Sequence, residues 1–138
     1  MMPVAERVDL STSRVPHRLA LTLTVLQFWA VAAYLIGGAA LYAWPGLQYD
    51  SLLQRGIPEW LLVVPGLLFV APGFWMAAFG TFFGTVFTAA GALVLATLRR
   101  HLSTRAATWL TAGSLLTAGV LIFSLTPLGD AVRIYILD

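Results

Sequence analysis

Long apolar stretches separated by short polar ones dominate the pattern of this chain. The first stretch covers about residues 19–44 and the last about 106–126, and neither contains a charged side chain. A helix of some 20 residues rises ~30 Å, which matches the hydrocarbon core of a bilayer. We therefore expect both stretches to be membrane-spanning helices.

The middle of the chain, Trp60 to Leu98, is a single uncharged stretch of 39 residues. It is too long for one straight span and barely long enough for two. Two Pro-Gly pairs interrupt it, and proline removes a backbone donor and clashes with the preceding turn. We therefore expect helix breaks at Pro65, Gly66, Pro72 and Gly73. The helical segments on either side would cover about residues 57–72 and 73–98.

Two arrangements of this middle stretch are open. In the first, Ile57 to Ala71 is a broken or re-entrant half-helix and Phe74 to Leu98 is a full span, so the chain crosses the membrane three times. In the second, two ordinary spans meet at a tight turn near residues 78–81, and the chain crosses four times. Three crossings place six of the eight arginines on one side, whereas four crossings divide them equally. The positive-inside rule thus favours three crossings with a cytoplasmic N-terminus, and hydropathy alone favours four.

Composition supports a membrane protein as a whole. Hydrophobic residues make up 59% of the 138 residues and charged residues only 10%, against about 25% charged in a soluble domain. We expect an all-α integral membrane bundle of four apolar helical segments in the cell membrane. Residues 19–129 would form its single domain, between a polar leader (1–18) and a short tail (130–138). The first apolar run is too long for a signal peptide, and we expect it to be retained.

Basic residues flank the expected spans. A net charge of +2 from scattered charges does not indicate a nucleic-acid partner. Arginines at span ends anchor a membrane protein at the lipid headgroups and set its topology. We assign this role to Arg14, Arg18, Arg99, Arg100 and Arg105.

Small residues recur at every fourth position in the third segment. The first two form a GxxxG pattern, which allows helix backbones to approach closely where lipid offers no hydrophobic driving force. The stripe predicts a helix-packing face, either within this chain or toward a partner. Its members are Gly80, Gly84, Thr88, Ala92 and Ala96.

Groups that carry chemistry are scarce. The chain has no cysteine and no charged residue inside an expected span, and His17 and His101 lie outside the spans. Intramembrane charge is usually functional where it occurs, and its absence argues against proton-coupled transport and intramembrane hydrolysis. Gln27, the one amide inside a span, is expected to form a structural hydrogen bond. We expect no cofactor, no metal site and no catalytic residue.

These features favour a non-catalytic role. The leading hypothesis is an accessory, assembly or scaffold subunit of a membrane complex, surrounded by the lipid bilayer and in contact with other membrane helices. The alternative is a small homo-oligomeric channel, carrier or holin-like pore. In that case the GxxxG stripe would mediate self-association, and the Pro-Gly pairs would lie near the pathway.

Overall fold

The computed structural model describes residues 10–44 and 49–138, and in this part of the chain almost every residue is helical and no strand occurs. The expectation of an all-helical fold is therefore confirmed. Four helices within the described residues are long and apolar enough to cross a membrane: Arg14–Ala43, Glu59–Ala78, Gly80–His101 and Thr104–Ser124.

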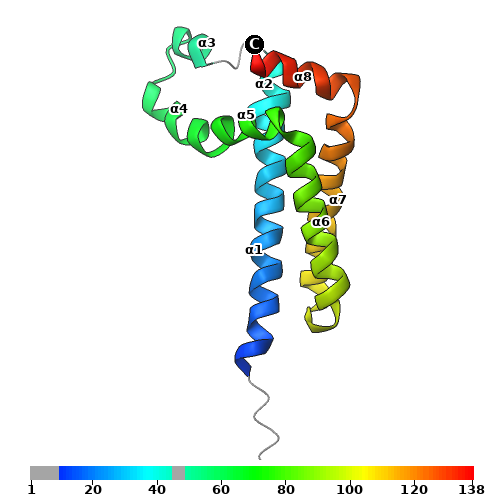
Figure 1. Cartoon of the computed structure of the whole chain (residues 1–138). Coiled ribbons are helices and arrows are strands. Elements are labelled where there is room, and N and C mark those ends of the chain that lie inside the picture. The colour runs from blue at the N-terminus through cyan, green and yellow to red at the C-terminus, as the bar shows by residue number, and fades with distance from the viewer. Residues whose placement is uncertain (1–9, 45–48) are drawn as a thin grey trace, which may run out of the picture.

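Three helical rods stand side by side and form the bundle (Figure 1). The first is α1 (Leu10–Tyr34), which continues through a π-helical turn, η2 (Leu35–Ala40), into the short α2 (Leu41–Ala43). The other two rods are α6 (Gly80–Leu98) and α7 (Thr104–Ser124), which run in opposite directions.

The first rod begins earlier than its apolar stretch. It starts at Leu10 rather than near residue 19, and includes Pro16. Once a helix has nucleated, each further residue adds one hydrogen bond, so the polar residues before the span extend it. The rod ends at Trp44 (φ −132°, ψ 82°), as expected, because a residue before proline disfavours the helical region. Residues 1–9 of the expected leader lie outside the described part.

A short 3₁₀ turn, η5 (Arg99–His101), connects α6 to α7. The Ser103 hydroxyl oxygen accepts a hydrogen bond from the Ala106 N–H at 3.2 Å and caps the start of α7. Such a cap satisfies one of the free N–H groups at a helix N-terminus. The hairpin therefore turns at the arginine-rich sequence that separates the two apolar segments.

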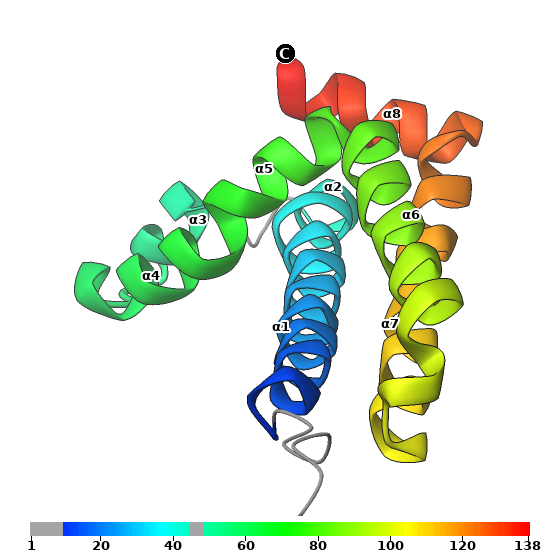
Figure 2. The same ribbon diagram turned by 60° about the horizontal axis from the view of Figure 1, so that its bottom comes forward.

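The remaining apolar segment does not stand parallel to the rods. It consists of α4 (Glu59–Pro65), the π-helical η4 (Gly66–Val70) and α5 (Ala71–Ala78), which together form one helical run of 20 residues. This run, here called the arm, lies across α1 and extends away from the bundle (Figures 1 and 2). The short helix α3 (Tyr49–Gln54) precedes it.

The arm is continuous at both Pro-Gly pairs, so the prediction of helix breaks at these pairs was wrong. Pro65 lies inside α4, Pro72 lies in the first turn of α5, and the π-helical turn joins the two helices. Within that turn the Ala71 N–H bonds to the carbonyl of Gly66, five residues back. The wider turn accommodates the prolines without ending the helix. The true break is at Phe79 (φ −118°, ψ 32°), between the arm and α6.

The tail contains a helix that the sequence argument missed. Helix α8 (Pro127–Leu137) begins where the Thr126 hydroxyl oxygen accepts from the Gly129 N–H at 3.2 Å. It lies over α5 at the same end of the bundle as α2 (Figure 1). Val132 of α8 is buried in a cluster with Ala30, Tyr34, Met76 and Ala77. A second cluster, nearer the hairpin, joins the three rods through Ala20, Val94 and Leu110.

Candidate functional site

Part of the small-residue stripe of α6 lies against α7 of the same chain. A Cβ atom added to Gly80 would lie 2.6 Å from the Ser124 hydroxyl oxygen. One added to Gly84 would lie 2.8 Å from the Cβ of Leu121. Glycine at both positions is therefore what permits the two helices to approach this closely.

The lower part of the stripe turns away from this contact. Thr88 still faces α7, where its hydroxyl donates to the hydroxyl oxygen of Thr117 at 3.2 Å. Ala92 and Ala96 are exposed, and Gly91 is buried in their place. A four-residue step overshoots one helical turn by roughly 40°, so a strict four-residue repeat rotates off a straight contact line. Whether Ala92 and Ala96 contact another chain stays a prediction.

A buried polar cluster lies inside the three rods. Gln27 of α1 has no exposed surface, and its side-chain nitrogen donates to the Phe87 carbonyl at 2.9 Å and to the Ser114 hydroxyl oxygen at 3.2 Å. The Ser114 hydroxyl in turn donates to the Leu110 carbonyl at 2.8 Å. The Gln27 oxygen, Oε1, has no hydrogen-bond partner among the described residues.

Two glycines make room for this amide. A Cβ added to Gly91 would lie 2.0 Å from the Ser114 oxygen, and one added to Gly113 would lie 2.5 Å from Oε1 of Gln27. Sequence reasoning found Gln27 but missed both glycines. Their signal was their position inside spans, where glycine costs about 0.5–1 kcal/mol relative to alanine. The cluster contains no ionisable group, so its chemistry is that of a hydrogen-bonded contact between helices.

The arm crosses the first rod at a contact between two glycines, Gly37 of η2 and Gly73 of α5. A Cβ added to Gly73 would lie 2.3 Å from the carbonyl oxygen of Ala33 and 2.5 Å from the Cα of Gly37. One added to Gly37 would lie 2.3 Å from the Phe69 carbonyl oxygen. The backbones of the arm and the first rod are thus in direct contact.

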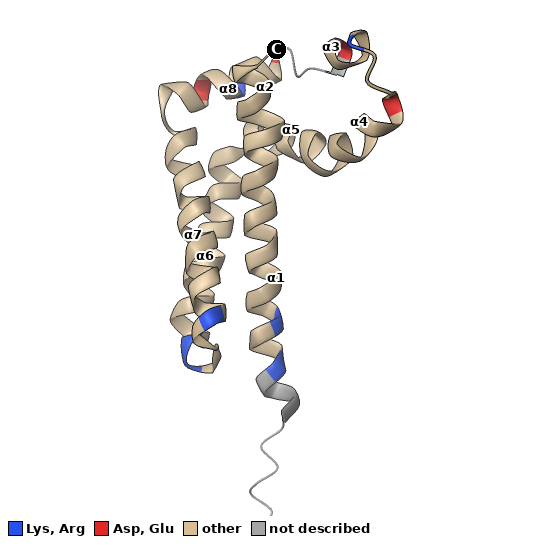
Figure 3. Ribbon diagram, turned by 180° about the vertical axis from the view of Figure 1, so that it is seen from behind, with Lys and Arg blue, Asp and Glu red and all other residues tan. Residues whose placement is uncertain are grey.

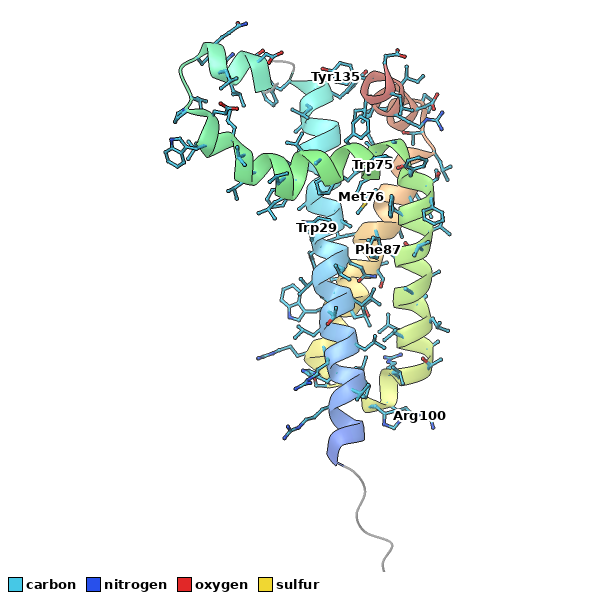
Figure 4. The ribbon with its side chains drawn as sticks, turned by 60° about the vertical axis from the view of Figure 1, so that its left-hand side comes forward. Trp29, Trp75, Met76, Phe87, Arg100 and Tyr135 are labelled. Carbon is cyan, nitrogen blue, oxygen red and sulfur yellow. The ribbon has the colours of Figure 1, made fainter. Side chains whose placement is uncertain are left out.

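A tryptophan beside the crossing point bonds to the backbone of the arm. The Trp29 indole nitrogen donates to the carbonyl oxygen of Leu68 at 3.0 Å. In an α-helix that carbonyl would accept from the N–H of residue 72, which proline does not have. Figure 4 shows Trp29 on α1 below the arm. The indole therefore satisfies a carbonyl that Pro72 leaves without its α-helical donor.

Charge divides between the two ends of the bundle (Figure 3). One end, here called the arginine end, holds the start of α1 and the hairpin between α6 and α7, with five arginines and no described carboxylate. The other end holds α3 and α8, where Arg133 and Asp130 form an ion pair. The arginine end carries Arg14, Arg18, Arg99, Arg100 and Arg105, and the other carries Arg55, Arg133, Asp50, Glu59, Asp130 and Asp138.

Both histidines lie near the arginine end, His17 on α1 and His101 in η5. Among the described residues, no three His, Asp or Glu side chains lie close enough together to hold a metal ion. Comparison of the chain with protein-family models, curated proteins and solved structures gave no match.

Proposed function

We propose that this protein is a non-catalytic accessory or assembly subunit of a membrane complex and that its arm docks against a different membrane polypeptide. The main support for this proposal is the arm. It is a 20-residue helix that lies across the bundle, and large apolar side chains are exposed along its length. They include Trp60, Val64, Leu67, Phe74 and Trp75.

The depth of the arm supports this proposal. Gly37, where the arm crosses, is about 28 Å along the first rod from Arg18 at 1.5 Å per residue. Gly80, where α6 leaves the arm, is about as far from Arg99. These rises match a hydrocarbon core of ~30 Å. With the arginine end at one headgroup layer, the arm lies at the opposite boundary of the core.

A single helix at that boundary is normally amphipathic, with a charged or polar face toward water. Residues 60–78 of the arm contain no charged, amide or hydroxyl side chain. A helix that is apolar on every side is stable where lipid or apolar protein surfaces surround it. Lipid can cover the side that faces the core, and an apolar surface of another subunit would cover the other side.

The same geometry supports a topology of three crossings. The three rods would cross the membrane and the arm would not. The arginine end would be cytoplasmic, because five of the seven described arginines lie there and cytoplasmic loops are enriched in Lys and Arg.

The alternative of a homo-oligomeric pore receives less support. Gly80, Gly84 and Thr88, which would mediate self-association, already contact α7 of the same chain. The polar groups of Gln27 and Ser114 point into the bundle, where they bond to each other rather than line an open passage.

The composition of the native particle tests the proposal. We would extract the protein from its own membrane in a mild detergent and measure the mass and subunits of the particle. A stoichiometric complex with a different, larger membrane protein is the expected result. A particle made only of copies of this chain would overturn the proposal and favour the pore.

A further inference from the structure

A groove opens between α1 and α7 at the arginine end. It has a volume of about 570 Å³. Its mouth is polar, with His17, Ser103 and Arg105. Its walls are apolar, formed mainly by Leu21, Val25, Phe28 and Trp109.

The length of the groove matches one membrane leaflet. Along α1 it extends from His17 to Phe28, a rise of about 16 Å at 1.5 Å per residue. Half of a ~30 Å hydrocarbon core is about 15 Å. The Phe28 and Trp109 rings, one from each wall, meet edge to face with centroids 6.0 Å apart. The groove thus has a polar opening at the headgroup level and an apolar wall as deep as one acyl chain.

The positive charge at the mouth of the groove favours an anionic lipid headgroup. Arg105 is exposed and forms no ion pair with any described carboxylate, since the described carboxylates lie at the opposite end of the bundle. Arg14 and Arg18 lie on the helix that forms one wall of the groove. An unpaired guanidinium at this level attracts a lipid phosphate.

A hydrogen-bond donor lies one helical turn deeper. Trp109 is 57% exposed, and its indole carries one N–H donor. One turn from Arg105 is about 6 Å, where the ester carbonyls of a phospholipid lie below its phosphate. Indole side chains with one apolar side and one donor favour this level of the membrane.

We propose that this groove binds one anionic phospholipid of the leaflet at the arginine end, with its phosphate at Arg105 and one acyl chain against Leu21, Val25 and Phe28. The site lies at the opposite end of the bundle from the arm and does not depend on its partner.

The test uses phosphatidylglycerol with a photoactivatable group in one acyl chain, added to the purified full chain in detergent. Labelling is expected on residues 21–28 and on Trp109. Arg105→Gln is expected to lower the labelling about fivefold, which corresponds to the ~1 kcal/mol that one arginine contributes near an anionic leaflet. Val25→Trp fills the groove without changing charge, and it should also lower the labelling.

Two matched variants and two competitors complete the test. Arg55→Gln removes an arginine at the other end of the bundle. Arg100→Gln removes one at the arginine end that lines a separate groove between α6 and α7. Both should label as the unchanged protein does, and excess inorganic phosphate should not compete. Equal labelling by phosphatidylcholine would overturn the proposal. So would an equal loss in Arg100→Gln, or labels confined to the groove between α6 and α7.

Discussion

Glycines at particular positions set how closely the helices of this protein approach one another. Gly91 and Gly113 leave space for the buried amide of Gln27, and Gly37 and Gly73 bring the arm into backbone contact with α1. Gly119, by contrast, has open space where a Cβ would be. The same residue type is therefore required at some positions and replaceable at others.

Replacing Gly91 with alanine should destabilise the bundle. The new Cβ would lie 2.0 Å from the Ser114 oxygen and 2.7 Å from the Gln27 nitrogen, so the polar cluster would have to shift. Overpacking of this kind costs about 1–3 kcal/mol. The measurement is the free energy of unfolding in mixed micelles. Gly119→Ala is the control and should be neutral or slightly stabilising. Equal effects of the two substitutions would contradict the packing described here.

The arm is the element that most distinguishes this fold from an ordinary bundle of spans. Its orientation depends on the contact between Gly37 and Gly73 and on the bond from Trp29 to the Leu68 carbonyl. These contacts join residues that are about 40 positions apart in the sequence. The arm is therefore held by tertiary contacts and not by its own sequence pattern.

A double-mutant cycle tests the role of Trp29. Trp29→Phe removes the indole N–H and should cost about 1–3 kcal/mol, because the Leu68 carbonyl loses its side-chain donor. Pro72→Ala restores a backbone N–H at the position that bonds to Leu68 in an α-helix. Trp29→Phe should then cost clearly less in the Pro72→Ala background, as measured by unfolding in micelles. Additive effects would show that the two residues do not share this carbonyl.

The sequence pattern predicted those elements that depend on local composition. The first apolar stretch became the rod of α1, η2 and α2, and the last became α7, because a long uncharged stretch with charged flanks is readable from local composition. For the middle stretch it left two positions open for the break, the Pro-Gly pairs and a turn near residues 78–81. The structure has the break at Phe79, because the π-helical turn and the Trp29 bond, which neighbouring residues do not reveal, keep the arm helical through both prolines. Helix α8 was missed because Thr126-Pro127 ends one helix and also begins the next.

The candidate sites were predicted only in part, for the same reason. Gln27 was recognisable as the one amide in a span, but its partners Phe87 and Ser114 lie on other helices. The sequence predicted that these five arginines share one end only in the arrangement with three membrane crossings. The groove between α1 and α7 required two helices to be placed side by side, which no local pattern specifies.

At the scale of the whole molecule, the separation of charge defines an orientation. Five of the seven described arginines lie at the end that holds the hairpin, and all described carboxylates lie at the other end with α3 and α8. A bundle with this asymmetry should insert with its arginine end in the cytoplasm.

Cysteine accessibility tests this orientation, since the chain contains no cysteine of its own. We expect Gln54→Cys and Asp138→Cys to react with a membrane-impermeant maleimide on intact cells. Ser103→Cys should react only after the membrane is permeabilised. Reaction of Gln54→Cys and Ser103→Cys without Asp138→Cys would indicate four crossings, and reaction of Ser103→Cys alone would indicate the reverse orientation.

The central claim, that the arm docks against a different polypeptide, is tested most directly by photo-crosslinking in the native membrane. A photoreactive amino acid would replace Leu67 of the arm, which is 69% exposed, or Leu115 of α7, which is 68% exposed and serves as the matched control. Position 67 is predicted to give one defined adduct with a larger membrane protein, and position 115 to give none. An adduct at position 67 that contains only a second copy of this chain, or the same pattern from both positions, would contradict the claim.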